Sequence, residues 1–167
     1  VQDFVYVNSG VEPDIRAVMF DPLKQEWPAY IGYAGEALDW DSLAQAIQEA
    51  NGVYLTTYSP AGLGFAKAGS VANRDSQTVD PSPLAHFGDG ISLSEVQSKL
   101  SDGELVIDLW WSSQAPMDGV TVLVHVYDGT GQLVAQGDGY PLAGLYPPRY
   151  WQPGDLVQDV RRIALPE

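Results

Sequence analysis

The chain has 167 residues, 45% of them hydrophobic, and a formal net charge of −14 at pH 7. A chain of this length and composition can bury a core, which excludes a disordered protein. Its eight Lys and Arg residues are too few and too scattered to form a phosphate-binding stripe. We therefore expect neither nucleic acid nor an anionic membrane surface as a partner.

The absence of cysteine narrows the chemistry further. It excludes disulfides, thiolate metal ligands and cysteine nucleophiles. No run approaches the ~18 apolar residues of a membrane span, and no signal-peptide pattern is present. Because the sequence starts at Val1 directly in a strand-like pattern, we interpret it as a fragment of a longer or proteolytically matured protein.

Residues 1–60 alternate strand-like and helix-like patterns. Runs of β-branched and aromatic residues predict the strands, and apolar residues at helical spacing predict the helices. In chain order we expect a strand at 4–9, a helix at 13–23, a strand at 29–35, a helix at 39–52 and a strand at 52–59. This order favours a small parallel sheet built with crossovers.

The clearest helical pattern is the one at 39–52. Asp39 or Asp41 is a suitable N-cap, and Asn51-Gly52 predicts a left-handed stop. Four apolar residues share one face of this helix: Leu43, Ala46, Ile47 and Ala50.

The middle of the chain is less regular. Residues 62–72 form a strand pattern that their glycines weaken. Residues 73–85 are polar and contain two prolines, which is typical of a linker or a long surface loop.

The last part of the chain predicts antiparallel β-structure. Strand patterns occur at 104–112, 118–128, 132–138 and 155–166, and residues 92–100 fit either a short helix or a strand. The first two strands are largely apolar on both faces, so we expect them to be central and covered on both sides. Asp128-Gly-Thr-Gly predicts a hairpin turn. Several short strands of this kind favour a β-sandwich.

Together these patterns predict an α+β chain. We expect a small strand–helix–strand–helix–strand unit at residues 1–72 and a linker or surface loop at 73–85. An antiparallel β-sandwich is expected at 86–167. The first unit is expected either to pack against the sandwich or to precede it.

Histidine and carboxylate residues are the first candidates for chemistry. We expect His125 to pair with Asp108 on a neighbouring strand, as a buried structural pair rather than an acid/base or metal site. His86 is the other histidine, and no metal-binding spacing joins the two. We expect no metal and no cofactor. A glycoside hydrolase would need two carboxyl groups facing each other across a cleft, and the sequence alone does not pair them.

Aromatic residues are the second set of candidates. The stretch 139–160 combines prolines, glycines and large aromatics. Flat exposed rings bind sugars by stacking. The alternative is that these rings pin a loop onto the sheet and cover its edge. The residues predicted to bind a ligand are Trp110, Tyr146, Tyr150 and Trp151.

Residues 85–93 and 105–166 carry a family resemblance. The shared elements are Phe87-Gly88-Asp89, Trp110-Trp111, Val124-His125-Val126, the hairpin DGTGQLVAQGD and the stretch PLAGLYPPRYWQPGD. They resemble a C-terminal extracytoplasmic domain that recurs in large membrane proteins of Chloroflexi-type bacteria. Many of those proteins resemble glycosyltransferases of the dolichyl-phosphate-mannose–protein mannosyltransferase type.

The resemblance implies a non-catalytic, extracytoplasmic accessory domain, anchored through a membrane part outside this sequence. The transferase chemistry of such proteins lies in that membrane part, so no catalytic residue is carried over. The implied partners are the rest of the parent chain and a glycan. The alternatives are an independent carbohydrate-binding β-sandwich module and a glycoside hydrolase that uses a carboxylate pair.

Overall fold

The computed structural model describes residues 2–7, 16–21, 26–32, 40–59, 62–73 and 82–166. The chain divides into two compact units, residues 1–72 and 73–167. Most of the described elements are β-strands, and one α-helix lies among them. The fold is therefore a β-rich α+β fold. No described helix has the length and apolar character needed to cross a membrane.

The first unit contains a mixed sheet with strand order β3-β2-β1-β4-β5. Among its described strands, β1 and β4 pair in parallel and the other neighbours pair antiparallel, so the expected parallel sheet is wrong except at this pair. The bounds of the strands and the helix are β1 (Gln2–Val7), β2 (Arg16–Asp21), β3 (Glu26–Gly32), α1 (Trp40–Glu49), β4 (Ala50–Ser59) and β5 (Gly62–Asn73).

The helix predicted at 13–23 is wrong, because its described part is strand β2. Val18 lies opposite Val5 of β1, and Met19 lies opposite Phe4. Prolines at 13 and 22 bound this segment. Too few residues remain between them for a stable helix, while a neighbouring strand satisfies the backbone of even a short segment.

Helix α1 confirms the pattern at 39–52 in its position and in its buried face. Leu43 and Ile47 are fully buried, and Ala46 and Ala50 are nearly so. The predicted stop is wrong: the helix ends at Glu49 and β4 starts at Ala50. The Asn51-Gly52 pair therefore belongs to a strand, at the register shift between Ala50, which lies opposite Gln2, and Val53, which lies opposite Phe4 of β1.

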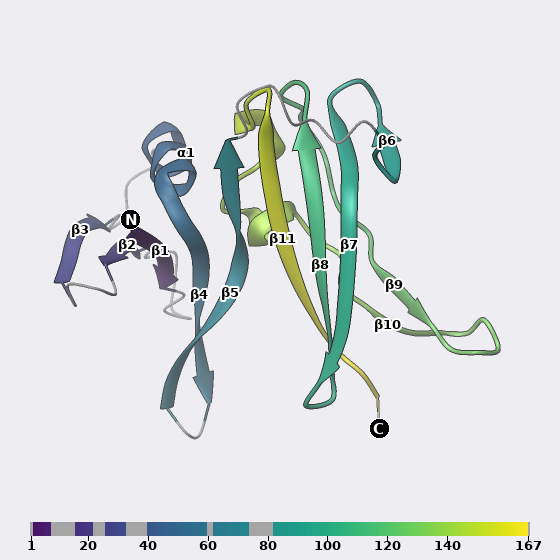
Figure 1. Ribbon diagram of the computed structural model, residues 1–167. Helices are drawn as coiled ribbons and strands as arrows, with labels where there is room; N and C mark the ends of the chain where they lie inside the picture. The colour runs from purple at the N-terminus through teal and green to yellow at the C-terminus, as the bar shows by residue number, and fades with distance from the viewer. Residues whose placement is uncertain are drawn as a thin grey trace. The chain divides into compact units, whose positions relative to one another are not determined.

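The second unit contains an antiparallel sheet with strand order β11-β8-β7-β6 and a separate hairpin of β9 and β10 (Figure 1). Residues 92–100 belong to a strand, because the two-residue turn Asp102-Gly103 joins β7 to β8 and both turn residues have positive φ. The bounds are β6 (Ala85–Phe87), β7 (Ile91–Ser101), β8 (Glu104–Ser113), β9 (His125–Tyr127), β10 (Leu133–Gln136) and β11 (Asp155–Ala164).

Strand β8 is central, as expected, since β11 and β7 flank it. The other strand expected to be central, 118–128, is not. It forms the short strand β9 and one isolated bridge between Val122 and Gly139. Val122 is buried, whereas Leu123 and Tyr127 are 67% and 57% exposed. Both faces of this segment are apolar, but only the valine face is covered.

Most of the stretch 139–160 is a loop that joins the two sheets, and its last residues, 155–160, belong to β11. The crossing loop, residues 137–154, leaves β10 and leads to β11. It contains two short 3-10 turns, η1 (Pro141–Gly144) and η2 (Pro148–Tyr150). The linker predicted at 73–85 lies mostly outside the described residues.

Gly137 gives a direct test of how the hairpin is seated on the sheet. A Cβ atom at Gly137 would lie 2.6 Å from Cδ1 and 2.7 Å from Cγ1 of Ile163, a buried residue of β11. We expect Gly137→Ala to lower the free energy of unfolding by about 1–3 kcal/mol, because this contact forces a shift in packed structure.

The measurement is urea denaturation, with Gly129→Ala as the matched control. A Cβ atom at Gly129 meets no atom within 4 Å. Equal effects of the two substitutions would contradict the packing of residue 137 against β11.

Candidate functional site

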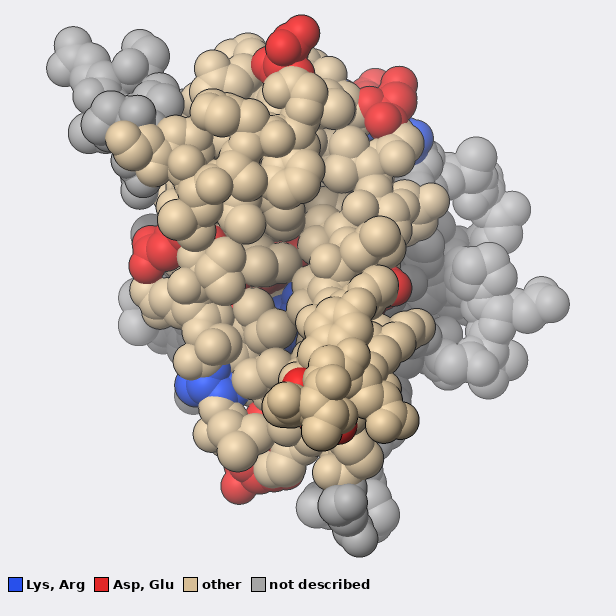
Figure 2. All heavy atoms as spheres, turned by 90° about the vertical axis from the view of Figure 1, so that its right-hand side faces the viewer, with Lys and Arg blue, Asp and Glu red and all other residues tan. Residues whose placement is uncertain are grey.

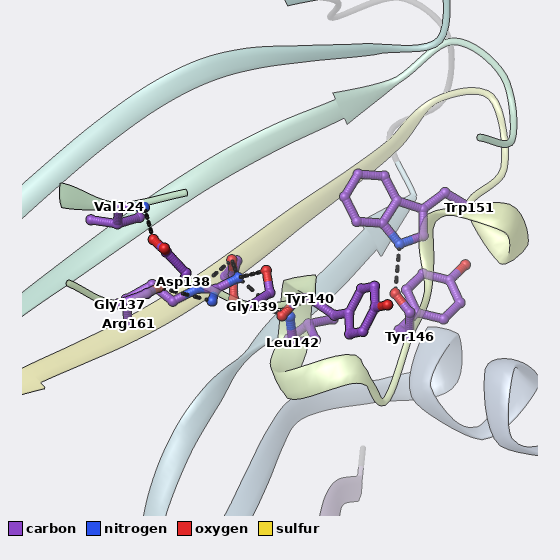
Figure 3. Close-up of polar contacts among 10 residues, drawn as sticks. Val124, Gly137, Asp138, Gly139, Tyr140, Leu142, Tyr146, Trp151 and Arg161 are labelled. Atoms are coloured by element: carbon purple, nitrogen blue, oxygen red, sulfur yellow. Dashed lines mark hydrogen bonds and ion pairs between the residues drawn. The ribbon is translucent and has the colours of Figure 1, made fainter. Parts of the chain in front are cut away.

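The crossing loop is held by one side chain of β11. The guanidinium of Arg161 donates to the carbonyl oxygens of Gly137 and Gly139, each at 3.2 Å, and to that of Tyr140 at 3.0 Å. Figure 3 shows the guanidinium lying among these carbonyl groups. The Gly139 carbonyl also accepts from the Val122 N–H at 2.9 Å. Arg161 thus adds a hydrogen-bond donor for three carbonyl groups where the backbone pairing of the hairpin ends.

Asp159 completes this arrangement from the same strand. Its Oδ2 accepts from Nε of Arg161 at 2.8 Å, and its Oδ1 accepts from the backbone N–H of Leu142 at 3.0 Å. The side chain is only 1% exposed. Burial raises the pKa of Asp159 above its ordinary value, although the Arg161 charge and the hydrogen bonds oppose the shift. Asp159 therefore fixes both Arg161 and the start of η1.

A second cluster closes the far end of the loop. The Tyr146 hydroxyl lies 2.9 Å from Oδ2 of Asp155 and 2.9 Å from the carbonyl oxygen of Tyr150. The indole N–H of Trp151 donates to the carbonyl of Tyr146 at 2.9 Å. Gln152 N–H donates to Asp155 at 2.8 Å. These bonds fold the loop back on itself before β11 begins.

The structure places two of the predicted ligand residues in the interior. Tyr146 and Trp151 are 0% exposed, and their rings stack at a centroid distance of 6.4 Å. Neither ring presents a free face to a sugar, so their side chains serve the loop. Tyr150 and Trp110 are half-buried. Arg149 lies over the Tyr150 ring, 5.0 Å from its centroid. A ligand role for Tyr150 and Trp110 stays a prediction.

The expected pairing of His125 with Asp108 is wrong. Asp108 accepts from the side chain of Gln158 at 2.7 Å, within the larger sheet. His125 lies on β9, which pairs with β10 rather than with β8. The imidazole Nε2 is 3.3 Å from Oδ2 of Asp138 instead, and both side chains are partly exposed.

His125 belongs to an exposed surface that we call the hairpin face. It consists of alternate residues of β9 and of the segment just before it, together with their neighbours on β10 and just after it. The Tyr127 hydroxyl lies 3.5 Å from Nδ1 of His125, and the two rings meet edge to face at 6.3 Å. Leu133 lies directly opposite Tyr127, and Gln136 lies opposite His125. The members of the hairpin face are Leu123, His125, Tyr127, Leu133, Gln136 and Asp138.

The hairpin face is anchored although it is exposed. Oδ1 of Asp138 accepts from the Val124 N–H at 2.8 Å, a contact visible in Figure 3. Its Oδ2 contacts His125. Figure 2 shows the side from which the hairpin projects as mostly uncharged and hollowed near its middle, with acidic groups scattered over it. Tyr127 was not among the sequence candidates, but the exposed series Leu123, His125 and Tyr127 follows strand spacing and is visible in the sequence.

At the turn of the hairpin, the side chain of Asp128 forms hydrogen bonds within the turn itself. Oδ1 of Asp128 accepts from Thr130 N–H at 2.8 Å, from the Thr130 hydroxyl at 2.7 Å and from Gln132 N–H at 3.0 Å. These bonds lower the pKa of Asp128, that from the Thr130 hydroxyl most. The sequence Asp-Gly-Thr-Gly thus makes the expected hairpin turn. Within the described part of the chain, no group of three or more His, Asp or Glu side chains is placed to hold a metal ion.

Comparisons with protein-family models, with curated proteins and with solved structures find no match to this chain.

Ala143 tests the strain in the crossing loop. Leu142 and Ala143 have left-handed φ values of 50° and 54°, a region that costs an L-residue about 1–2 kcal/mol. Glycine removes this cost. It also raises the conformational entropy of the unfolded chain, which lowers the free energy of unfolding by about 0.4–1 kcal/mol. We therefore expect Ala143→Gly to raise the free energy of unfolding by about 0.5–1 kcal/mol in urea denaturation.

The matched control for Ala143 is Ala164→Gly in β11, where glycine should lower stability by about 0.5–1 kcal/mol. A loss of stability at both positions would contradict the left-handed conformation of Ala143.

Asp159 gives a pH test. Because its pKa in the folded protein is raised above the ordinary 3.8, the unfolded chain loses this proton first as pH rises. Stability contributed by protonated Asp159 is therefore present below pH 3.8 and is lost as pH rises through the folded-state pKa.

We expect wild-type protein to lose stability relative to Asp159→Asn over this window, by at most about 1.4 kcal/mol per pH unit. Urea denaturation across a pH series measures the difference, and Asp118→Asn at an exposed site is the control. A difference that does not change with pH would contradict the burial of Asp159.

Proposed function

We propose that this chain is a non-catalytic extracytoplasmic accessory domain of a larger membrane-anchored protein that resembles a glycosyltransferase, and that it recognises a glycan through the hairpin face. The resemblance over residues 85–93 and 105–166 supports the accessory role and the location. Several of the residues that carry it bond to one another where the crossing loop meets β11, including Tyr146, Trp151 and Asp155. These residues of the shared pattern thus stabilise the folded conformation of the loop.

The observation that carries the glycan proposal is the exposed Tyr127 ring beside an anchored polar pair. Tyr127 is 57% exposed, and an exposed aromatic face stacks on the apolar face of a pyranose ring. His125 and Asp138 lie next to it and provide hydrogen-bond donors and acceptors for hydroxyl groups. Gln136, opposite His125, adds an amide with both functions.

The proposal includes a sandwich-type packing in the second unit. Its support is the contact of the hairpin base with β11 through Gly137, Ile163 and Arg161. An independent carbohydrate-binding module is the second candidate, and the same hairpin face favours it. The two differ in whether the isolated chain binds the glycan as well as the parent protein does.

The test is titration of the ¹⁵N-labelled chain, residues 1–167, with a panel of neutral and acidic oligosaccharides, followed by NMR. We expect saturable shifts at residues 123–138 for at least one sugar. Tyr127→Ala should weaken that binding about tenfold, equivalent to about 1.4 kcal/mol, because the stacking surface is lost.

The matched control is Tyr140→Ala, which removes a tyrosine that is 58% exposed and lies outside the hairpin face. No binding across the panel would reject the glycan proposal and leave the accessory role. Equal weakening by both substitutions would place the site elsewhere.

A further inference from the structure

Strand β7 has an open edge over most of its length. It pairs with β8 from residue 91 to residue 101, whereas β6 covers only residues 91–93 on its other side. Residues 94–101 have no second neighbour among the described strands, and residues 95–101 are exposed. Figure 1 shows β6 beside one end of β7 only. An open strand edge is a template for pairing with another strand.

The turn after β7 determines which backbone groups point outward. In a two-residue hairpin the residues that flank the turn form a hydrogen-bonded pair, and here these are Ser101 and Glu104. Alternate residues back along β7, namely Lys99, Gln97 and Glu95, therefore direct their N–H and C=O groups to β8. The residues between them, Val96, Ser98 and Leu100, direct theirs to the open edge.

The other end of β7 agrees with this assignment. The carbonyl of Leu93 accepts from Leu84 N–H at 2.8 Å, on the outer side. One extra residue, Ser94, lies between Leu93 and Glu95 in the register with β8. This bulge moves the outward set from odd-numbered to even-numbered residues. Both ends of the strand thus assign outward backbone groups to Val96, Ser98 and Leu100.

The apolar side chains along the open edge are symmetric about Ser98. On one face Val96 and Leu100 are 44% and 68% exposed. On the opposite face Glu95 and Lys99, of opposite charge, are both exposed. Such a strand is complementary to its own copy in antiparallel orientation.

We infer that two copies of this chain associate by antiparallel pairing of their β7 edges around a two-fold axis at Ser98. Ser98 then lies opposite Ser98 of the second copy, as a hydrogen-bonded pair. Val96 lies opposite Leu100 of the second copy, an apolar cross-strand pair. Glu95 lies diagonal to Lys99 of the second copy, within reach of long side chains. The contact is isologous and closes after two copies.

The association is weak. The paired segment is short, and each copy carries a net charge of −14, whose repulsion is screened beyond about 8 Å at physiological salt. The axis is perpendicular to the sheet, so the β9–β10 hairpins, which project past β7 (Figure 1), lie on the same face of the joined sheet. We expect half of the chains to be dimeric at a chain concentration of about 10–100 µM.

Cysteine cross-linking tests the register, since the chain has no cysteine of its own. Across the axis the two Cα atoms of residue 98 lie about 5.5 Å apart, within the range that a disulfide spans. Ser98→Cys should give a covalent dimer under mild oxidation. The matched control Ser101→Cys should not, because the two copies of residue 101 lie about 20 Å apart in this register.

Charge substitutions test the contact without cross-linking, by sedimentation equilibrium of residues 1–167. Glu95→Lys places like charges at the diagonal and should weaken the dimer about tenfold, although it lowers the net negative charge. Lys99→Glu should weaken it similarly. The double variant Glu95→Lys with Lys99→Glu has the wild-type net charge and should restore the association.

Three results would overturn the proposal. The first is a chain that stays monomeric up to 1 mM (about ten times the upper expected value), as obstruction by the hairpins would cause. The second is cross-linking of Ser98→Cys and Ser101→Cys to equal extents. The third is a dimer strengthened by Glu95→Lys, which would show that only net charge governs association. Pairing of the open edge with another protein instead would leave this chain monomeric.

Discussion

The second unit depends on the buried pair of Asp159 and Arg161. A buried ion pair is stable only where its remaining hydrogen-bonding groups are satisfied. Here the guanidinium of Arg161 donates to three loop carbonyl groups, and the carboxylate of Asp159 accepts from the N–H of Leu142. The loop therefore satisfies the two charged groups, and the charged groups bond to the loop where the regular pairing of the hairpin ends. Leu142, whose N–H this carboxylate binds, has a left-handed backbone conformation.

The same constraint separates structural from exposed aromatics. Once the loop is fastened at Arg161, its far end folds so that the Tyr146 hydroxyl and the Trp151 indole bond within the cluster around Asp155. Two of the rings that make this stretch conspicuous in the sequence, Tyr146 and Trp151, are then interior. Tyr127, on the hairpin that enters the loop, is left outside. The exposed hairpin face thus lies next to the Asp159–Arg161 pair and outside the buried aromatic cluster.

The sequence predicted elements with local signals well. Helix α1, strands β8 and β11 and the turn at Asp128 were found from spacing and turn residues. Strand β2 and the surface position of β9 were missed, because tertiary pairing decides both. The partner of His125 was missed because strand order cannot be read from alternation. Asp159 and Arg161 were not singled out, since nothing local marks a strand carboxylate as buried against a distant loop.

The bulge at Ser94 has a consequence for how this sequence can change over time. Because one unpaired residue offsets residues 91–93 from the part of β7 that the turn orients, an insertion or deletion near residue 94 would exchange the two faces of the strand on one side of the bulge. Substitutions along the edge alter one position each, whereas a change of length alters every position on that side. Related sequences should therefore vary in residue type between 94 and 101 while keeping the number of residues constant.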